Sequence, residues 1–213
     1  MKNHFYRSTG ISLISGALLI IFTMLLHPLG GSIERIISIY NIITTAHSLA
    51  IVSLPIVLFG FYGLSVCLLD TYRFSLLSFI IIAFGLIAAM FAALFNGLVL
   101  PYFLHQYSDR LTETMDILKP ISNFSFAINL PLDYIFIIAC CLSIFIYSMI
   151  ILAKRIFPRW IGYLGIAIAL FAIIGFVTAF VFTSLTGFRI FTFSIAFWIL
   201  SSGVYLIKNK VKP

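Results

Sequence analysis

The sequence predicts an all-helical, polytopic integral membrane protein with six transmembrane helices in one bundle. Three observations lead to this fold class. The 213 residues are 62% hydrophobic and only 9% charged, whereas soluble domains carry about 25% charged residues. The apolar residues fall in six stretches, and each has at least the roughly 20 residues that a helix needs to cross a bilayer. Almost all charges lie in the gaps between these stretches.

The spans follow one another closely along the chain. The loops between them are too short to hold a soluble domain, so residues 1–213 form one six-helix transmembrane domain. We expect the spans near residues 8–28, 42–69, 74–103, 122–152, 160–184 and 187–207.

The first stretch begins like a secretory signal, with Lys2 and Arg7 before an apolar run. The run is too long for a signal peptide and no small-residue cleavage site follows it. We therefore interpret it as a retained first span. Beyond it, Ser32 can cap a helix and Glu34 suits that helix's first turn, which predicts a short interfacial helix over residues 32–41.

The third span carries Gly85, Ala89 and Ala92 on one stripe, and Asn96 continues it. Small residues let membrane helices approach closely, so we expect Asn96 to be buried at a helix–helix contact.

The longest outer loop, 104–121, contains acidic residues that we interpret as solvated. The fourth span has a proline at Pro131, the fifth repeats the small-residue pattern, and the sixth completes the bundle. All three cysteines lie within spans, where they are typical of small core residues rather than of disulfides.

The distribution of Lys and Arg predicts the orientation. Six spans place both termini on one side, and cytoplasmic loops collect basic residues. The side with the termini carries one acid, Asp70, against the basic residues Lys2, Arg7, Arg73, Lys154, Arg155, Arg159, Lys208, Lys210 and Lys212. We therefore expect both termini in the cytoplasm, with the chain in the inner (cytoplasmic) membrane and lipid around it. The net charge of +7 then reflects topology, and nucleic-acid binding is excluded because no soluble basic module is present.

Polar side chains in five of the six spans fall at one depth. Counting from the cytoplasmic charges at about 1.5 Å per residue places them near the outer edge of the hydrocarbon core. The candidate ligand-binding residues of this polar layer are His27, His47, Asn96, Asn129, Asp133 and Arg189.

Two interpretations of the layer remain open. It is either the level at which polar groups become tolerable near the interface, or a pocket that opens to the outer face. An ionisable residue within a span indicates a functional site, and Asp133 is the strongest case. Its expected partner is Arg189 or a protonated His27 or His47.

A metal ion is the cofactor that these residue types would suit, although no cofactor is required. His27, His47 and Asp133, with His105 as a possible addition, offer suitable ligands. The two histidines formally suit a haem, but His27 precedes Pro28, where the helix should end. Nucleotide-binding loops, zinc-protease motifs and nucleophile elbows are not found. The sequence therefore identifies no catalytic residue.

Five short stretches resemble, in order and spacing, a group of uncharacterised bacterial six-span integral membrane proteins. The stretches are His27-Pro28-Leu29-Gly30-Gly31, Ala46-His47-Ser48-Leu49, Phe59-Gly60-Phe61-Tyr62-Gly63-Leu64, Leu98-Val99-Leu100-Pro101 and Phe157-Pro158-Arg159-Trp160-Ile161-Gly162. The resemblance implies the six-span fold and no activity. In that group we expect an acid at the position of Asn96, so this chain departs from the pattern and lacks a general base there.

Four functions remain open. The chain could bind a small molecule or lipid in a polar pocket at the outer leaflet, or serve as a structural partner in a homo-oligomer or larger membrane complex. It could also be a membrane-embedded, metal-assisted enzyme, which requires His27, His47 and Asp133 to converge. A small transporter or channel subunit would need polar residues that continue to the cytoplasmic side. The inner halves of the spans offer little besides serines and cysteines for such a path.

Overall fold

The structure is a computed structural model that describes residues 2–69, 73–155 and 157–208. Asp70, Lys210 and Lys212, used above to predict orientation, lie outside these ranges. The described residues are helical, without strands. Within them, six helical segments are long and apolar enough to cross a membrane, as predicted. They are His4–Leu26, Tyr40–Leu69, Phe74–His105, Ser108–Lys154, Arg159–Val177 and Leu185–Lys208.

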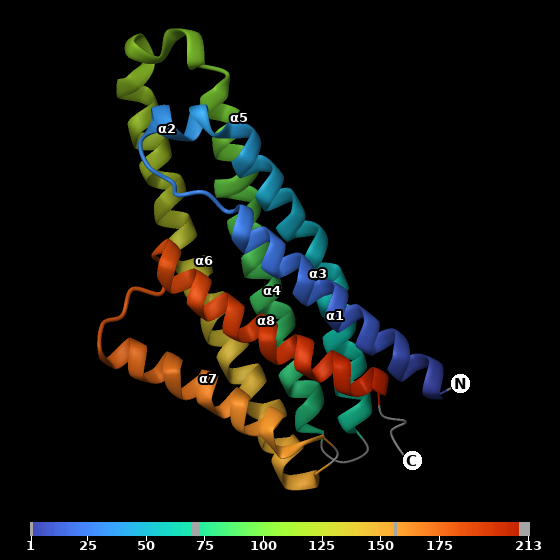
Figure 1. Cartoon of the computed structure of the whole chain (residues 1–213). Helices are drawn as coiled ribbons and strands as arrows, with labels where there is room; N and C mark the ends of the chain where they lie inside the picture. Colours follow the sequence, from blue (N-terminus) through green and yellow to red (C-terminus); the bar gives the residue numbers. More distant parts are fainter. Residues whose placement is uncertain (1, 70–72, 156, 209–213) are drawn as a thin grey trace.

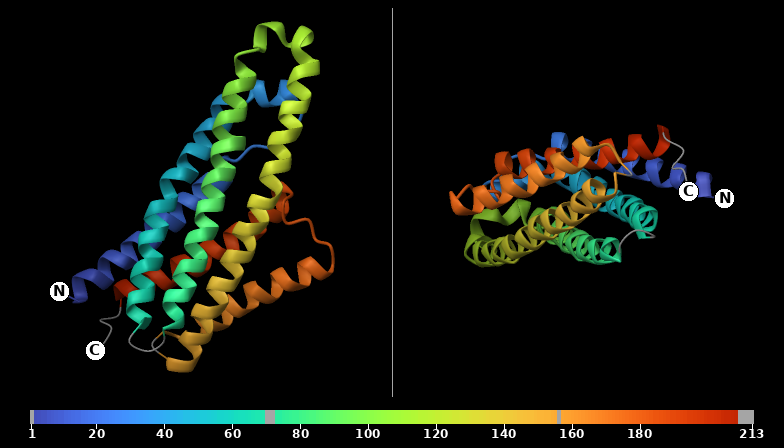
Figure 2. Two further views of the ribbon diagram at one scale, coloured as in Figure 1. Left: turned by 180° about the vertical axis from the view of Figure 1, so that it is seen from behind. Right: turned by 90° about the horizontal axis from the view of Figure 1, so that it is seen from below.

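The long helices pack side by side. Helix α1 (Lys2–Leu26) lies between α3 (Tyr40–Leu69) and α8 (Leu185–Lys208), and α4 (Phe74–Leu94) lies between α3 and α6 (Leu111–Lys154). Helix α7 (Arg159–Val177) packs mainly on α6. Figures 1 and 2 show that α1 begins and α8 ends at the same end of the bundle. We call this the lower end.

The opposite end forms a separate cap. There α3, α6 and the continuation of α4 extend past the ends of α1 and α8 (Figure 1). Helix α4 passes through a π-helical turn, η1 (Phe95–Val99), into α5 (Leu100–His105), and the 3-10 turn η2 (Ser108–Arg110) leads into α6. Helix α2 (Ile33–Ser38) packs against α5. The cap has its own apolar core of Ile33, Ile36, Ile39, Ile43, Leu100, Leu104 and Leu118.

A buried aromatic layer crosses the bundle below its middle. The Phe61 ring stacks on Tyr147 at a centroid distance of 5.9 Å, and Tyr147 stacks on Trp198 at 6.2 Å. The Tyr147 hydroxyl hydrogen-bonds to the Ser65 hydroxyl at 2.6 Å, and Trp198 Nε1 donates to the Ile161 carbonyl at 3.0 Å. The layer therefore ties α3, α6, α7 and α8 together with its polar atoms satisfied.

Several predicted boundaries are corrected. The first span ends at Leu26 rather than residue 28, because Pro28 disfavours helical geometry at His27. The outer loop 104–121 is largely helical, and Leu118 from this segment is buried in the cap core. The short helix predicted at 32–41 is present as α2, with the Ser32 hydroxyl accepting from the Arg35 backbone N–H at 3.4 Å.

The fifth span ends at Val177 rather than residue 184. Ala179 adopts a left-handed conformation, with φ of 56°. The Phe180 N–H then donates to the Gly175 carbonyl at 2.8 Å, and the Ala179 N–H donates to the Phe176 carbonyl at 3.4 Å. These two bonds form a Schellman C-cap. Its terminating residue is alanine rather than glycine, so the sequence does not reveal the helix end.

Candidate functional site

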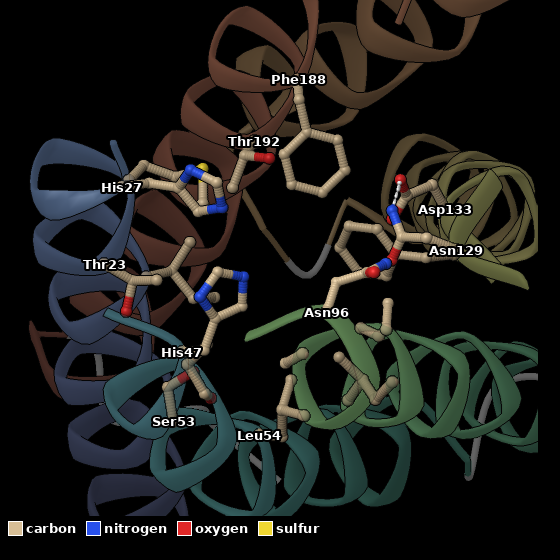
Figure 3. Close-up of a pocket in the computed structure, with 18 of the residues that line it drawn as sticks. Thr23, His27, His47, Ser53, Leu54, Asn96, Asn129, Asp133, Phe188 and Thr192 are labelled. Atoms are coloured by element: carbon tan, nitrogen blue, oxygen red, sulfur yellow. Dashed lines mark hydrogen bonds between the residues drawn. The ribbon is translucent and has the colours of Figure 1, made fainter. Parts of the chain in front are cut away.

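A cavity of about 340 Å³ lies between α1, α3, α4, α6 and α8, beside the cap. Its volume falls within the range of roughly 300–1,000 Å³ that is typical of small-molecule pockets. Most of the lining side chains are apolar. The lining includes five of the six residues of the predicted polar layer, namely His27, His47, Asn96, Asn129 and Asp133. Figure 3 shows the two histidines on one side of the cavity and Asn129 with Asp133 on the other.

His27 and His47 pack together on the first wall, with ring centroids 4.8 Å apart. The Nδ1 of His27 lies 3.1 Å from the Pro28 carbonyl, and the Nδ1 of His47 lies 2.9 Å from the Ile43 carbonyl. A carbonyl only accepts hydrogen bonds, so each Nδ1 carries the proton. In a neutral imidazole the Nε2 is then an unprotonated acceptor. Both rings therefore have an Nε2 lone pair available.

Burial holds the pKa of His27, which lies one residue beyond the end of α1, below its ordinary value. Desolvation of the ring is the main cause, and the positive charge of Arg189 lowers the pKa further. The hydrogen bond to the Pro28 carbonyl opposes both effects. The folded protein thus favours the neutral imidazole, in which Nε2 is an acceptor.

Asn96 reaches the cavity from the π-helical turn η1. A π-turn inserts one residue into a helix and often occurs at functional sites. The Oδ1 of Asn96 accepts from the Ser125 hydroxyl of α6 at 2.7 Å, which agrees with the predicted helix contact. The neighbouring Gly97 packs so closely against His47 that a Cβ at position 97 would overlap the imidazole ring. The turn therefore positions both residues.

Asp133 and Asn129 form the opposite wall on α6. Asn129 Nδ2 donates to Asp133 Oδ2 at 2.6 Å. The two residues are one helical turn apart and face the same side. Pro131 lies between them within α6. It removes a backbone donor from the helix but leaves the helix continuous.

The expected pairing of Asp133 with Arg189 is wrong. Arg189 Nε donates to the Met24 carbonyl at 3.2 Å, and its terminal NH2 donates to the His27 carbonyl at 2.8 Å. Arg189 is not part of the cavity lining. Carbonyls at a helix C-terminus lack intrahelical partners and favour a positive charge. Arg189 therefore caps α1 from α8 and leaves Asp133 with Asn129.

Three buried polar atoms of the lining residues have no hydrogen-bond partner among the residues that the structure describes. They are the Thr23 hydroxyl of α1, the Thr192 hydroxyl of α8 and the amide nitrogen of Asn96. A buried polar group without a partner is costly, and such groups are few in native proteins. They are therefore the expected contacts of a molecule in the cavity.

The histidines and Asp133 do not converge as a metal site. Within the described ranges, no three His, Cys, Asp or Glu side chains are close enough to hold a metal ion together. His105 lies in the cap, where its ring stacks on Tyr40 at 4.6 Å. The predicted combination of His27, His47 and Asp133 is thus divided between two walls of the cavity.

Thr23, Thr192, Ser125 and Gly97 are site residues that the sequence did not reveal. Threonines, serines and glycines recur throughout the spans, so their types carry no specific signal. Gly97 could have been noticed beside Asn96, but only the π-turn explains its position.

Comparison with protein-family models, curated proteins and solved structures finds no match for this chain. The resemblance to uncharacterised six-span proteins therefore remains a prediction. Function has to be argued from the cavity.

Proposed function

We propose that this protein crosses the bacterial inner membrane six times and binds a small amphiphilic molecule or lipid in the cavity between α1, α3, α4, α6 and α8. The observation that carries the proposal is the combination of an apolar lining with three unpaired buried polar atoms, those of Thr23, Asn96 and Thr192. An apolar pocket with a few placed polar groups is typical of small-molecule sites. A chain of the ligand would contact the apolar lining, and its head would bond to the polar atoms.

The aromatic layer favours binding over conduction. Phe61 lines the cavity on the side of the layer, and it stacks on Tyr147. Between α4 and α6, the Ser78 hydroxyl donates to the Ser143 carbonyl at 2.7 Å. These polar groups are paired with each other rather than arranged along an open path. A transporter would need the layer to open, so we give the binding function precedence.

We further propose that both termini lie in the cytoplasm, which places the cavity toward the outer leaflet. Basic residues at the lower end include Arg7, Arg159 and Lys208, and cytoplasmic segments are enriched in Lys and Arg. With this orientation the polar cavity lies where amphiphiles of the outer leaflet have their head groups. Membrane lipid is then both the solvent and the source of the ligand.

The proposal can be tested by thermal unfolding of the purified protein in mild detergent. Three probes share one chain and differ in head group: 1-octanol, octylamine and octanoate. A ligand that binds only the folded state stabilises it by about 2.7 kcal/mol at 100 times its Kd. We expect the melting temperature to rise with the concentration of at least one probe. Binding of that probe should be saturable in calorimetry.

Two variants of α4 make the test specific. Ala89 lines the cavity, so Ala89→Phe should fill it and abolish the rise. Met90 is 37% exposed on the outside of α4, so Met90→Phe should leave the rise unchanged. A rise that does not saturate, or that persists in Ala89→Phe, would contradict binding in the cavity.

A further inference from the structure

The charge inventory of the cavity is one-sided. Asp133 is the acid among the lining residues, and no Lys or Arg occurs in that lining. Arg189, which adjoins the lining residue His27, already bonds to the carbonyls of Met24 and His27. A carboxylate removed from water without a counter-ion is strongly disfavoured. Such an acid takes up a proton unless a cation is at hand, and a cationic ligand would supply the counter-ion that keeps Asp133 ionised.

The hydrogen-bonding inventory has the same bias. Asp133 uses Oδ2 to accept from Asn129, and no described residue bonds to its Oδ1. His27 and His47 both donate through Nδ1 to carbonyls, which leaves each Nε2 as an acceptor. Besides these three acceptors, the described lining offers two amide donors, the unpaired nitrogen of Asn96 and the second N–H of Asn129. A head group that carries several N–H donors complements this arrangement.

Aromatic rings provide a second preference for a cation. Phe126, Phe136 and Phe188 line the cavity, and the rings of Phe136 and Phe188 lie 6.0 Å apart. Phe136 follows Asp133 by three residues on α6, so their side chains are neighbours on the helix surface. The faces of aromatic rings attract ammonium groups, most strongly away from water. An ammonium group at Asp133 would thus meet a carboxylate and aromatic faces together.

We infer that the ligand is a lipophilic amine whose protonated nitrogen binds Asp133 while its chain occupies the apolar part of the cavity. This inference rests on the proposed function, because it names the head group of the molecule that the cavity binds. Fatty acids and phosphate-bearing head groups do not fit, since their charge repeats that of Asp133. A neutral alcohol leaves the carboxylate without a counter-ion.

The three octyl probes test the head group directly in the full-length protein. A charge-assisted hydrogen bond is roughly twice as strong as a neutral one. We expect octylamine to bind at least about tenfold more tightly than 1-octanol, and octanoate to bind most weakly. Equal affinities for octylamine and 1-octanol, or tighter binding of octanoate, would overturn the inference.

The variant Asp133→Asn identifies the residue responsible. Asparagine keeps the shape of the side chain and an oxygen that accepts from Asn129, so the cavity should persist. Octylamine should then bind no more tightly than 1-octanol, whose affinity should change little. As a matched control on the same helix, Asp116→Asn alters an exposed acid of the cap and should keep the amine preference. A preference that survives Asp133→Asn would overturn the assignment.

The two proposals fail in different ways. If no probe binds saturably to the wild-type protein, the proposed function itself is wrong. If 1-octanol binds and Ala89→Phe abolishes its binding, but octylamine has no advantage, only the inference about the amine is wrong. The wild-type ranking decides this even if Asp133→Asn does not fold.

Discussion

The imidazole ring of His47 occupies the space that a side chain at Gly97 would need. This contact joins α3 to the π-helical turn of the third span, and the same turn presents Asn96 to the cavity. The glycine thus serves packing at one wall of the site. Gly97 does not have a positive φ, so the turn requires glycine here for close packing and not for an unusual backbone conformation.

Gly97→Ala should destabilise the protein although alanine favours helices. The new methyl group would overlap the His47 ring, and overpacking of this kind costs about 1–3 kcal/mol. Gly30→Ala is the matched control, because a Cβ at Gly30 meets no atom within 4 Å. Thermal unfolding in detergent measures both. A melting temperature of Gly97→Ala equal to that of Gly30→Ala would contradict the contact.

The number and order of the spans could be predicted because apolar length alone determines them. Boundaries were less predictable where tertiary contacts decide them. Leu118 extends α6 into the cap by packing there, and Ala179 ends α7 with a cap that usually uses glycine. The π-turn at Asn96 packs against α3, and hydropathy does not reveal such a local change of helix type.

The sequence predicts the depth of the candidate site residues in the membrane, but not which of their side chains contact one another. Counting residues placed His27, His47, Asn96 and Asp133 at one level, and they do line one cavity. Which side chains meet depends on the rotation and tilt of each helix. Arg189 therefore caps α1 instead of pairing with Asp133, a contact between residues far apart in sequence.

Arg189→Gln should destabilise α1 at its C-terminal end. The substitution removes the charge that bonds to the Met24 and His27 carbonyls, and hydrogen bonds to charged groups contribute about 1.5–3 kcal/mol. Arg35→Gln, at an exposed position of α2, should change the melting temperature little. The effects of Arg189→Gln and Asp133→Asn should add, because the two residues do not form a pair. A large coupling energy in the double mutant would restore the ion pair predicted from the sequence.

Lowering the pH should decrease the stability of the folded protein, because His27 then becomes protonated. Its pKa in the folded state is lowered from the ordinary value of 6.5, so the unfolded chain binds the proton more readily than the folded protein does. Stability is therefore retained above about pH 6.5 and declines as the pH falls below it. The ring faces His47 from α3 and Arg189 from α8, and a positive charge on either group disfavours protonation of His27. Melting temperatures between pH 8 and pH 5 should fall less steeply in His27→Gln than in wild type. His4→Gln, at an exposed site, should retain the wild-type slope.

Tyr147→Phe should destabilise the aromatic layer without closing the cavity. Ser65 donates its single hydroxyl proton to the Ser75 carbonyl at 2.8 Å, which leaves Tyr147 as the donor to Ser65 across 2.6 Å and, more weakly, to the Phe61 carbonyl at 3.5 Å. Loss of this buried hydrogen bond should cost about 0.5–1.5 kcal/mol. The ring that stacks on Phe61 remains, so probe affinity should be unchanged. Tyr163→Phe, 60% exposed, provides the control. A double-mutant cycle with Ser65→Ala measures the bond itself, and a coupling energy near zero would show that the two hydroxyls do not interact.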